Sequence, residues 1–399
     1  MVRVSTVNYF LTVLLSLTGA SYLRRASRDP QASVLYFNSN NNSGNTVIAI
    51  PVAGDGTLLK QGVTVIPTGG LGGAIVEIST LEPFTPDALN SQNSIIREGE
   101  YLFVVNAGSN TVSMLKINSQ NPTKLTLVGT PVNTLGDFPV TVAASSEINQ
   151  VCVANTGATA GVACFSYSPS GITSLGASFT PFILGQENPP RGPPNTVGTT
   201  FFNSDATALY TTIKSSAGNA LLPGAFVINP VVNGKVTTRS IVSVPAGSNQ
   251  MFGATNLPNT SDVIVADTGL GALRLAINQK DWTASTISKI TIAFEMASCW
   301  AVYSYTTNTV FITDGDRNYI YELTVDGTII SSYTFAQNTL YLDPWAAGDF
   351  LCSLANNVNG TPAIAVFDIG GGPGTARQVQ EYFPVGASVQ SQGMAVWTR

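Results

Sequence analysis

The chain has 399 residues, a net charge of −5 with only 10% charged residues, and no histidine. Without imidazole it cannot hold a Ser-His-Asp or Cys-His nucleophile system, a histidine zinc site or a histidine general base. The acidic balance and the lack of a long Lys/Arg run argue against nucleic-acid and anionic-membrane partners, which are bound through basic patches.

The first 20 residues have the order of a secretory signal peptide. Arg3 precedes an apolar run over residues 7–17, and the small residues Thr18-Gly19-Ala20 follow. A membrane anchor or a buried strand is the alternative, but the run is shorter than the roughly 20 residues that a membrane-spanning helix needs. We expect residues 1–20 to be a signal peptide, residues 21–32 with Arg24-Arg25 to be a linker or short pro-segment, and the protein to be secreted and extracellular.

Secretion gives meaning to three Asn-X-Ser/Thr sequons in expected loops, because glycans are added in the secretory lumen. The expected glycosylation sites are Asn41, Asn259 and Asn359. No second apolar segment has the length of a membrane span, and the C-terminal residues 395–399 do not form a lipid-anchor tail.

An oxidising compartment also permits disulfides. Cys152 and Cys164 flank a turn centred on Ala158, so a regular hairpin would bring them face to face and allow a disulfide. For Cys299 and Cys352 the sequence leaves two readings open, a second bridge or two buried free thiols.

From residue 34 onward the chain repeats one unit seven times. In each copy an apolar strand ends, in all but one case, at Asn or Asp, a Gly/Ser/Asn turn follows, and a second apolar strand begins. The copies start at Val34, Leu102, Val151, Leu209, Val263, Val310 and Leu351. The fourth copy is degenerate and has a long turn before Gly224. No segment shows a sustained 3.6-residue period, so the repeat predicts antiparallel hairpins.

A repeat of roughly 50 residues is close to the length of a propeller blade. The sequence therefore predicts an all-β protein in which residues 33–399 form a single seven-bladed β-propeller of four-stranded antiparallel blades. A pair of β-sandwiches or a β-helix is the alternative. Residues 392–397 look like an innermost strand without outer partners, so we expect the C-terminal strand to complete blade one.

One repeat also resembles a known family. Residues 99–113, GEYLFVVNAGSNTVS, followed by residues 124–129, KLTLVG, resemble the repeat of the seven-bladed lactonase superfamily. That superfamily includes the bacterial 6-phosphogluconolactonases and the fungal 3-carboxy-cis,cis-muconate lactonizing enzymes, or muconate cyclases. A secreted fungal branch carries segments like residues 89–94, LNSQNS. The resemblance implies a ligand site at the mouth of the central channel, built from residues that open the innermost strands.

In this sequence the segments that open those strands carry mostly amides and single charges. The expected ligand-binding residues are Gln92, Asn93, Asp137, Arg191, Asn195, Asn249 and Gln392. Arg191 could hold a carboxylate or phosphate in a bidentate way, or could be a solvated loop residue. The resemblance also implies a histidine and arginines in this layer of the cyclases, and the histidine cannot carry over to a chain that has none.

Two carboxylates are candidates for proton transfer in place of that histidine. Glu187 could act as a general base or could simply pair with Arg191, and Asp343 opens an innermost strand. No cofactor is expected. A Ca²⁺-type ion could be held by Asp343 and Asp137 with the amides Asn93, Asn195 and Asn249, although such residues at strand openings are more often turn caps.

Two functions follow from these features. The first is a secreted lactonase-like or cyclase-like propeller that binds a small lactone, organic acid or sugar acid at the channel mouth, with catalysis diverged or lost because histidine is absent. The second is a non-catalytic secreted or cell-wall glycoprotein that binds a wall component or protein partner. The same scaffold hosts both kinds of function, so the site has to decide between them.

Overall fold

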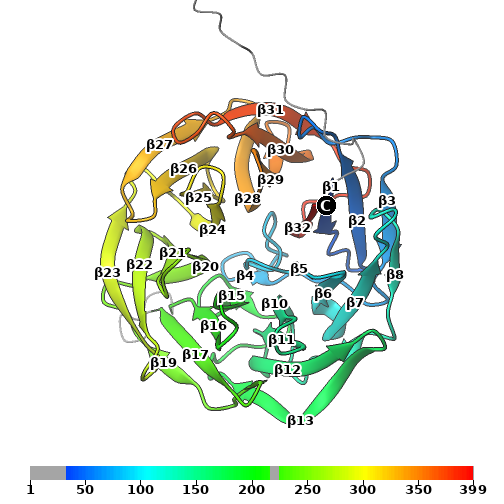
Figure 1. The fold of residues 1–399 in the computed structure, drawn as a ribbon, viewed down its shortest axis with the longest axis vertical. Coiled ribbons are helices and arrows are strands. Elements are labelled where there is room, and N and C mark those ends of the chain that lie inside the picture. The colour runs from blue at the N-terminus through cyan, green and yellow to red at the C-terminus, as the bar shows by residue number, and fades with distance from the viewer. Residues whose placement is uncertain (1–32, 216–223, 399) are drawn as a thin grey trace, which may run out of the picture.

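The computed structural model describes residues 33–215 and 224–398, and these residues form a ring of seven β-sheets around a central axis (Figure 1). Each sheet is a blade whose innermost strand lies near the axis and whose last strand lies at the rim. The all-β prediction and the seven-bladed propeller of four-stranded antiparallel blades are confirmed. Within the described ranges, no helix has the length and apolar character needed to cross a bilayer.

The strands of blades one to four, innermost first, have the following bounds. Blade one is β32 (Gln392–Thr398), β1 (Ser33–Asn38), β2 (Thr46–Val52) and β3 (Thr64–Pro67). Blade two is β5 (Ile95–Glu98), β6 (Tyr101–Asn106), β7 (Thr111–Ile117), β8 (Leu125–Leu127) and β9 (Val132–Asn133), with the 3₁₀ helix η1 (Ala107–Ser109) between β6 and β7. Blade three is β10 (Pro139–Ser145), β11 (Gln150–Asn155), β12 (Gly161–Ser168) and β13 (Gly171–Pro181). Blade four is β15 (Val197–Phe202), β16 (Ala208–Ile213), β17 (Ala225–Val232), β18 (Lys235–Val236) and β19 (Ile241–Ser243).

Blades five to seven are more regular, with four strands each. Blade five is β20 (Gln250–Asn256), β21 (Val263–Thr268), β22 (Gly271–Asn278) and β23 (Thr283–Thr291). Blade six is β24 (Ser298–Ser304), β25 (Thr309–Asp314), β26 (Tyr319–Thr324) and β27 (Ile329–Thr334). Blade seven is β28 (Asn338–Ala347), β29 (Phe350–Asn357), β30 (Pro362–Asp368) and β31 (Arg377–Tyr382). Outside the blades, β4 (Val76–Glu77) and β14 (Arg191–Gly192) form a short parallel pair.

The seven sequence copies are the middle two strands of the seven blades. These strands are buried because each blade packs face to face against its neighbours, as in β11, where all six residues are buried. Rim strands such as β27 alternate between exposed and half-buried residues instead. The apolar core therefore consists of layers between adjacent blades, one of which joins Tyr36 and Val47 of blade one to Leu102 and Leu115 of blade two.

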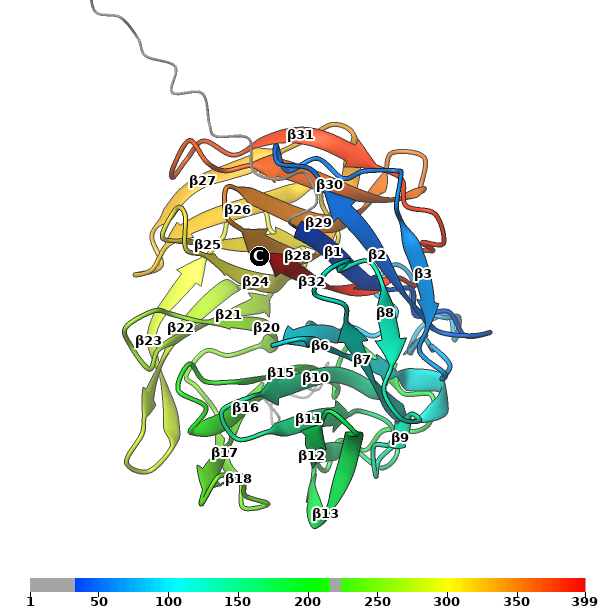
Figure 2. The ribbon, with the colours of Figure 1, turned by 45° about the vertical axis from the view of Figure 1, so that its right-hand side comes forward.

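The C-terminal strand closes the ring, as expected. β32 pairs with β1 in antiparallel register from Ser33–Thr398 to Asn38–Gln392, so blade one contains both ends of the described chain. The two strands lie side by side in both views (Figures 1 and 2). Closure of this kind leaves no long unpaired strand edge at the junction.

The Asn or Asp at the end of each repeat strand has a structural role. Asn155 at the end of β11 accepts a hydrogen bond from Thr134 Oγ1 and donates to Thr134 O. Asp267 at the end of β21 accepts hydrogen bonds from the backbone N–H groups of Asn249 and Gln250. In both blades the side chain ties a repeat strand to the connection that leads into the innermost strand. The repeated polar position thus caps loops and is not a repeated ligand site.

Cys152 and Cys164 lie directly opposite each other on β11 and β12 and are joined by a disulfide. Cys299 and Cys352 are buried free thiols, so of the two readings that the sequence left open, the structure has the unbridged one. Arg274 makes an ion pair with Asp262 at 2.6 Å, which is a structural contact within blade five.

Candidate functional site

One end of the central channel is closed by the chain itself. The connection between blades one and two, residues 68–94, is longer than the other connections between blades, and the next longest is residues 182–196. The two long connections meet where β4 pairs with β14. Residues 87–94, which we call the plug, then run through the middle of the ring (Figure 1).

The plug is held by hydrogen bonds to several blades. Its backbone contacts blade three, where Val142 N donates to Asn93 O, and blade four, where Gln92 N donates to Gly198 O. The indole of Trp300 in blade six donates to Ser91 O, and Leu89 N donates to Gln392 of blade one. The sequence can follow this path because Asp87, Asn90 and Asn93 adopt positive φ, which Asp and Asn tolerate better than most residues.

Gln92 reaches across the axis with its side chain. Its Nε2 donates to the carbonyl oxygens of Ala254 and Ala301, both at 3.1 Å, and its Oε1 accepts from Ala301 N at 3.1 Å. Gly253 makes room for it, because a Cβ at that position would lie 1.9 Å from Gln92 Oε1. The Gln92 amide therefore links the inner strands of blades five and six.

Beneath the plug lies a buried pair of opposite charges. The ammonium group of Lys214 donates to Thr196 Oγ1 and Val197 O at 3.1 Å and to Asn90 O of the plug, and it lies 4.2 Å from the centre of the Phe252 ring. Burial lowers the pKa of Lys214 to about 8, while the charge of Asp87 opposes this shift. Burial raises the pKa of Asp87 to about 7, against the influence of Lys214. All three donors of Lys214 are used within the protein, so its contacts anchor the plug.

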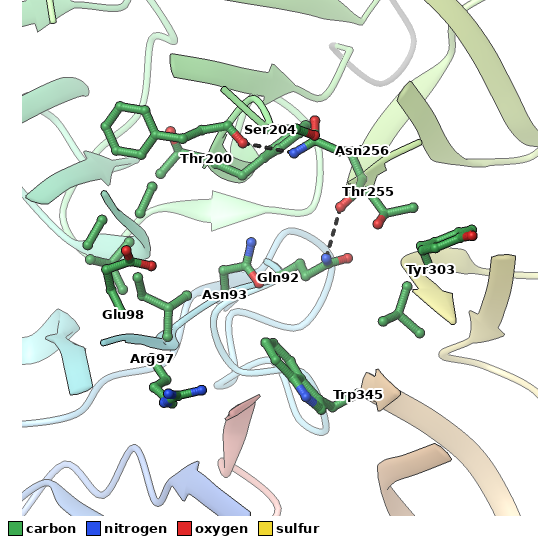
Figure 3. A pocket seen from close by; sticks show the side chains of 18 of the residues that line it. Gln92, Asn93, Arg97, Glu98, Thr200, Ser204, Thr255, Asn256, Tyr303 and Trp345 are labelled. Atoms are coloured by element: carbon green, nitrogen blue, oxygen red, sulfur yellow. Dashed lines mark hydrogen bonds between the residues drawn. The ribbon is translucent and has the colours of Figure 1, made fainter. Parts of the chain in front are cut away.

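The other end of the channel opens into a cavity of about 600 Å³. All seven inner strands contribute to its wall, mostly from their second halves, and Gln92 and Asn93 of the plug form part of its floor. Figure 3 shows these two amides at the centre of the cavity, with Arg97 and Trp345 on one side and Thr255 and Asn256 on the other. The cavity is therefore on the axis, open at one end and closed by the plug at the other.

The wall of this cavity can form many hydrogen bonds but carries few charges. Among the described residues, Arg97 is the only basic residue that lines it. The guanidinium of Arg97 stacks on the ring of Trp397 at 4.5 Å, and its Nε donates to Gly99 O. The polar residues that share the lining with it are Ser145, Ser146, Thr200, Asn203, Ser204, Thr255, Asn256 and Tyr303.

Asp343 lines the same cavity from blade seven. It lies at a register shift of β28 between Leu342 and Trp345 and has a φ of 43°, so the inner strand bulges at this carboxylate. Its Oδ2 accepts hydrogen bonds from Gly393 N at 2.7 Å and Gln392 Nε2 at 3.1 Å. Burial raises the pKa of Asp343 well above its usual value, although the Gly393 N–H opposes this, and the charge of Asp87 adds to the rise. Bulges and unusual backbone angles often occur at functional sites.

The residues proposed from the sequence do not converge on one site. Gln92, Asn93 and Asp343 line the open cavity, and Gln392 is buried between Asp343 and the plug. Arg191 lies on the closed side of the channel, at the start of β14. Together these positions show that the cavity lies at the end where the inner strands finish, and not where they begin.

Arg191 and Glu187 form an ion pair with each other, with 47% and 56% of their side chains exposed. Neither lines the axial cavity. Their neighbour Asn195 has a positive φ, and its carbonyl accepts a hydrogen bond from Gln186. The ion-pair reading of Glu187 is the one that the structure displays.

Asp137 and Asn249 serve as local caps. Asp137 accepts hydrogen bonds from Asn110 Nδ2 and Thr159 N, and Asn249 donates to Thr268 O. The oxygen ligands considered for a calcium ion are thus engaged in separate local contacts. In the described part of the chain, no group of three or more Cys, Asp or Glu side chains is placed to hold a metal ion.

Sequence reasoning missed Arg97, Trp345 and the plug. Arg97 lies in a short inner strand at a position that the resemblance does not mark. The only available signal was length, since residues 68–94 exceed the usual size of a connection between strands, and long loops in compact domains are commonly functional.

Solved structures with the same fold come from several bacteria. The periplasmic gluconolactonase of Pseudomonas aeruginosa superposes with a TM-score of 0.63 at 12% identity, covering 92% of this chain and 99% of that one. A candidate 6-phosphogluconolactonase from Bacteroides fragilis gives a TM-score of 0.62 at 10% identity, with 93% and 99% covered. A protein from Lactobacillus plantarum gives 0.60 at 14% identity, with 91% and 99% covered.

These likenesses establish the fold alone. The chain has the seven-bladed propeller fold of 6-phosphogluconolactonase-like proteins. No family model matches the sequence, and no curated protein matches it either. Function therefore has to be argued from the residues of the cavity.

Proposed function

We propose that the protein binds a small sugar acid or its lactone in the axial cavity. The observation that carries this proposal is the lining, in which a single arginine lies among amides, hydroxyl groups and one tryptophan around a closed floor. A cavity of about 600 Å³ is within the usual range for small-molecule sites. Polar groups in such number suit a ligand with many hydroxyl groups.

Arg97 is the expected anchor for the acidic group of the ligand. Its guanidinium offers paired N–H donors to a carboxylate. Stacking on Trp397 holds the side chain in place, so less conformational freedom is lost when a ligand binds. Trp345 provides an aromatic face across the cavity from Arg97, next to Gln92.

Asp343 is the residue that we propose for proton transfer. Hydrolysis of a lactone adds water to the carbonyl carbon and breaks the ring C–O bond, and the leaving oxygen needs a proton. A buried carboxyl group with a raised pKa can be protonated near neutral pH and can supply that proton. Lactonization of an unsaturated acid also requires a proton donor, in that case toward carbon. Glu187 is a weaker candidate because its carboxylate is paired with Arg191 outside the cavity.

Binding is tested by calorimetry with gluconate, galacturonate and glucono-1,5-lactone. We expect Arg97→Gln to weaken binding of the two acids about tenfold or more, since one charged hydrogen-bonding group is lost. Arg191→Gln is the matched control on the closed side and should leave affinity unchanged. If none of the three compounds binds, or if Arg191→Gln weakens binding as much as Arg97→Gln, the proposed site is wrong.

Catalysis is tested separately with Asp343→Asn, which keeps the shape of the side chain and tolerates the positive φ. We expect this variant to retain gluconate binding and to lose lactone hydrolysis. Hydrolysis that persists in Asp343→Asn would remove Asp343 from the reaction. Binding without turnover in the wild-type protein would leave a binding propeller.

We also propose that the protein is secreted and glycosylated. The signal-peptide order lies in residues 1–20, outside the described residues. The disulfide between Cys152 and Cys164 supports an oxidising compartment, and Asn41, Asn259 and Asn359 are all exposed as glycans require. Amino-terminal sequencing of protein from the growth medium, and its mass before and after glycosidase treatment, test this proposal. An uncleaved, unglycosylated intracellular protein would contradict it.

A further inference from the structure

Tyr305 is an exposed aromatic residue at the rim of the axial cavity. It lies in the turn between β24 and β25 and lines the cavity, yet 85% of it is exposed. A tyrosine offers a large apolar face and a polar tip, and it loses little conformational freedom on binding. An aromatic ring in this position enlarges the contact surface beyond the cavity itself.

The turn that carries Tyr305 is held in place from both sides. The Tyr303 ring packs edge-on against the Tyr305 ring, with the centres 4.8 Å apart at 89°, and the Tyr303 hydroxyl donates to Asn308 Oδ1 at 2.5 Å. Thr306 Oγ1 donates to Gly348 O of blade seven at 2.6 Å. The ring of Tyr305 is therefore supported before any ligand binds, which lowers the cost of ordering it.

The cavity admits a ligand from one end only. The plug closes the channel at Gln92 and Asn93, so a chain-like ligand cannot pass through the ring and must end on this floor. The rim opposite Tyr305 carries acidic groups. Glu98 and Glu147 line the cavity there, and Glu98 Oε1 accepts a hydrogen bond from Ser146 N. These carboxylates disfavour further negative charges on the part of the ligand that reaches the rim.

We propose that the cavity and Tyr305 form two consecutive subsites for a short oligosaccharide with one acidic end unit. The acidic unit lies on the plug floor beside Arg97, and the neutral sugar linked to it packs against Tyr305. This inference rests on the proposed function, because it assigns the acidic unit to the same cavity. It adds that the ligand is a chain end and not a free monosaccharide.

The test compares gluconate with cellobionate and lactobionate, in which a neutral hexose is linked to gluconate. We expect the two longer compounds to bind the full-length protein about tenfold or more tightly than gluconate. Tyr305→Ala should reduce this ratio toward one, and Tyr305→Phe should keep most of it. Phe294→Ala removes an aromatic residue that is 81% exposed in the connection before β24 and should leave the ratio unchanged.

Each outcome has a distinct meaning. If gluconate binds and the longer compounds bind no more tightly, or if Tyr305→Ala leaves the ratio unchanged, the second subsite is wrong and the proposed function stands. If neither gluconate nor the longer compounds bind, both proposals fail.

Discussion

At one end of the central channel, residues 68–94 and 182–196 cover the ring, whereas the other end opens into the axial cavity. The covered end has an arginine that is already paired, since Arg191 meets the exposed carboxylate of Glu187. The open end has Arg97, which is fixed by stacking on Trp397. The difference teaches that a charged residue near a channel is a ligand anchor only where the chain leaves it room.

The two ends also differ in how their acidic groups are placed. Asp87 lies buried near Lys214 at the plug, whereas Asp343 lies at a strand bulge that faces the cavity. Gln392 connects the two regions, because it donates to Asp343 and accepts from Leu89 of the plug. The plug therefore supports the floor of the cavity and the orientation of its buried acid at once.

The largest expected effect comes from removing residues 392–399. This deletion takes away β32, which pairs with β1 along its length, and also the Gln392 contacts to the plug. We expect loss of the cooperative thermal transition, because both the ring closure and the channel floor are lost. Deletion of Arg399 alone is the control. A truncated protein that melts like the parent would show that closure does not stabilise the ring.

Gln92→Ala is expected to cost about 2–4 kcal/mol of unfolding free energy, since it removes three buried hydrogen bonds between the plug and blades five and six. Chemical denaturation measures this loss. The exposed Gln120→Ala is the matched control and should change stability by less than about 0.5 kcal/mol. Equal effects of the two variants would mean that the plug is not anchored by Gln92.

Gly253→Ala tests the same contact from the blade. The added Cβ would overlap Gln92 Oε1, so we expect a loss of about 1–3 kcal/mol. In the double variant Gln92→Ala/Gly253→Ala the clash with the amide is gone, and the combined loss should be smaller than the sum of the single losses. Strict additivity would contradict direct contact between the two sites.

Stability should rise as the pH falls from 8 to 5. Burial raises the pKa of Asp87 to about 7 and that of Asp267 to about 6, so the folded protein takes up protons in this range more readily than the unfolded chain. Lys214, with its pKa lowered to about 8, loses stability for the fold mainly above this range, as the pH falls from about 10 to 8. We expect an increase in Tm on the order of a few degrees, and Asp267→Asn should reduce the rise between pH 7 and 5. A Tm that falls steadily from pH 8 to 5 would contradict the assignment.

The smallest effect is expected at the covered end. Arg191→Ala and Glu187→Ala break an ion pair whose side chains are about half exposed, and such pairs contribute roughly 0–1 kcal/mol. Thermal melting should shift by no more than about 1 °C for either variant. A large shift would mean that the β4–β14 cover depends on this pair, and the contrast with the open end would then be weaker.

The sequence by itself determined the ring. Seven copies of one strand-turn-strand pattern set the middle two strands of each blade, and the strand at residues 392–397 lacked outer partners, which predicted how the ring closes. The spacing of Cys152 and Cys164 around one turn also predicted their register. These features are readable because alternating side chains, apolar runs and turn residues act over a few neighbouring positions.

Only the tertiary structure decided which end of the channel is open. The plug depends on hydrogen bonds from Gln92 to Gly198, Ala254 and Ala301, residues that are more than one hundred positions away in the chain. The length of residues 68–94 hinted at a special connection, but no local pattern says where such a loop will lie. Arg97 and Tyr305 became candidates, and Arg191 did not, because packing of distant segments determines which side chains face an open cavity.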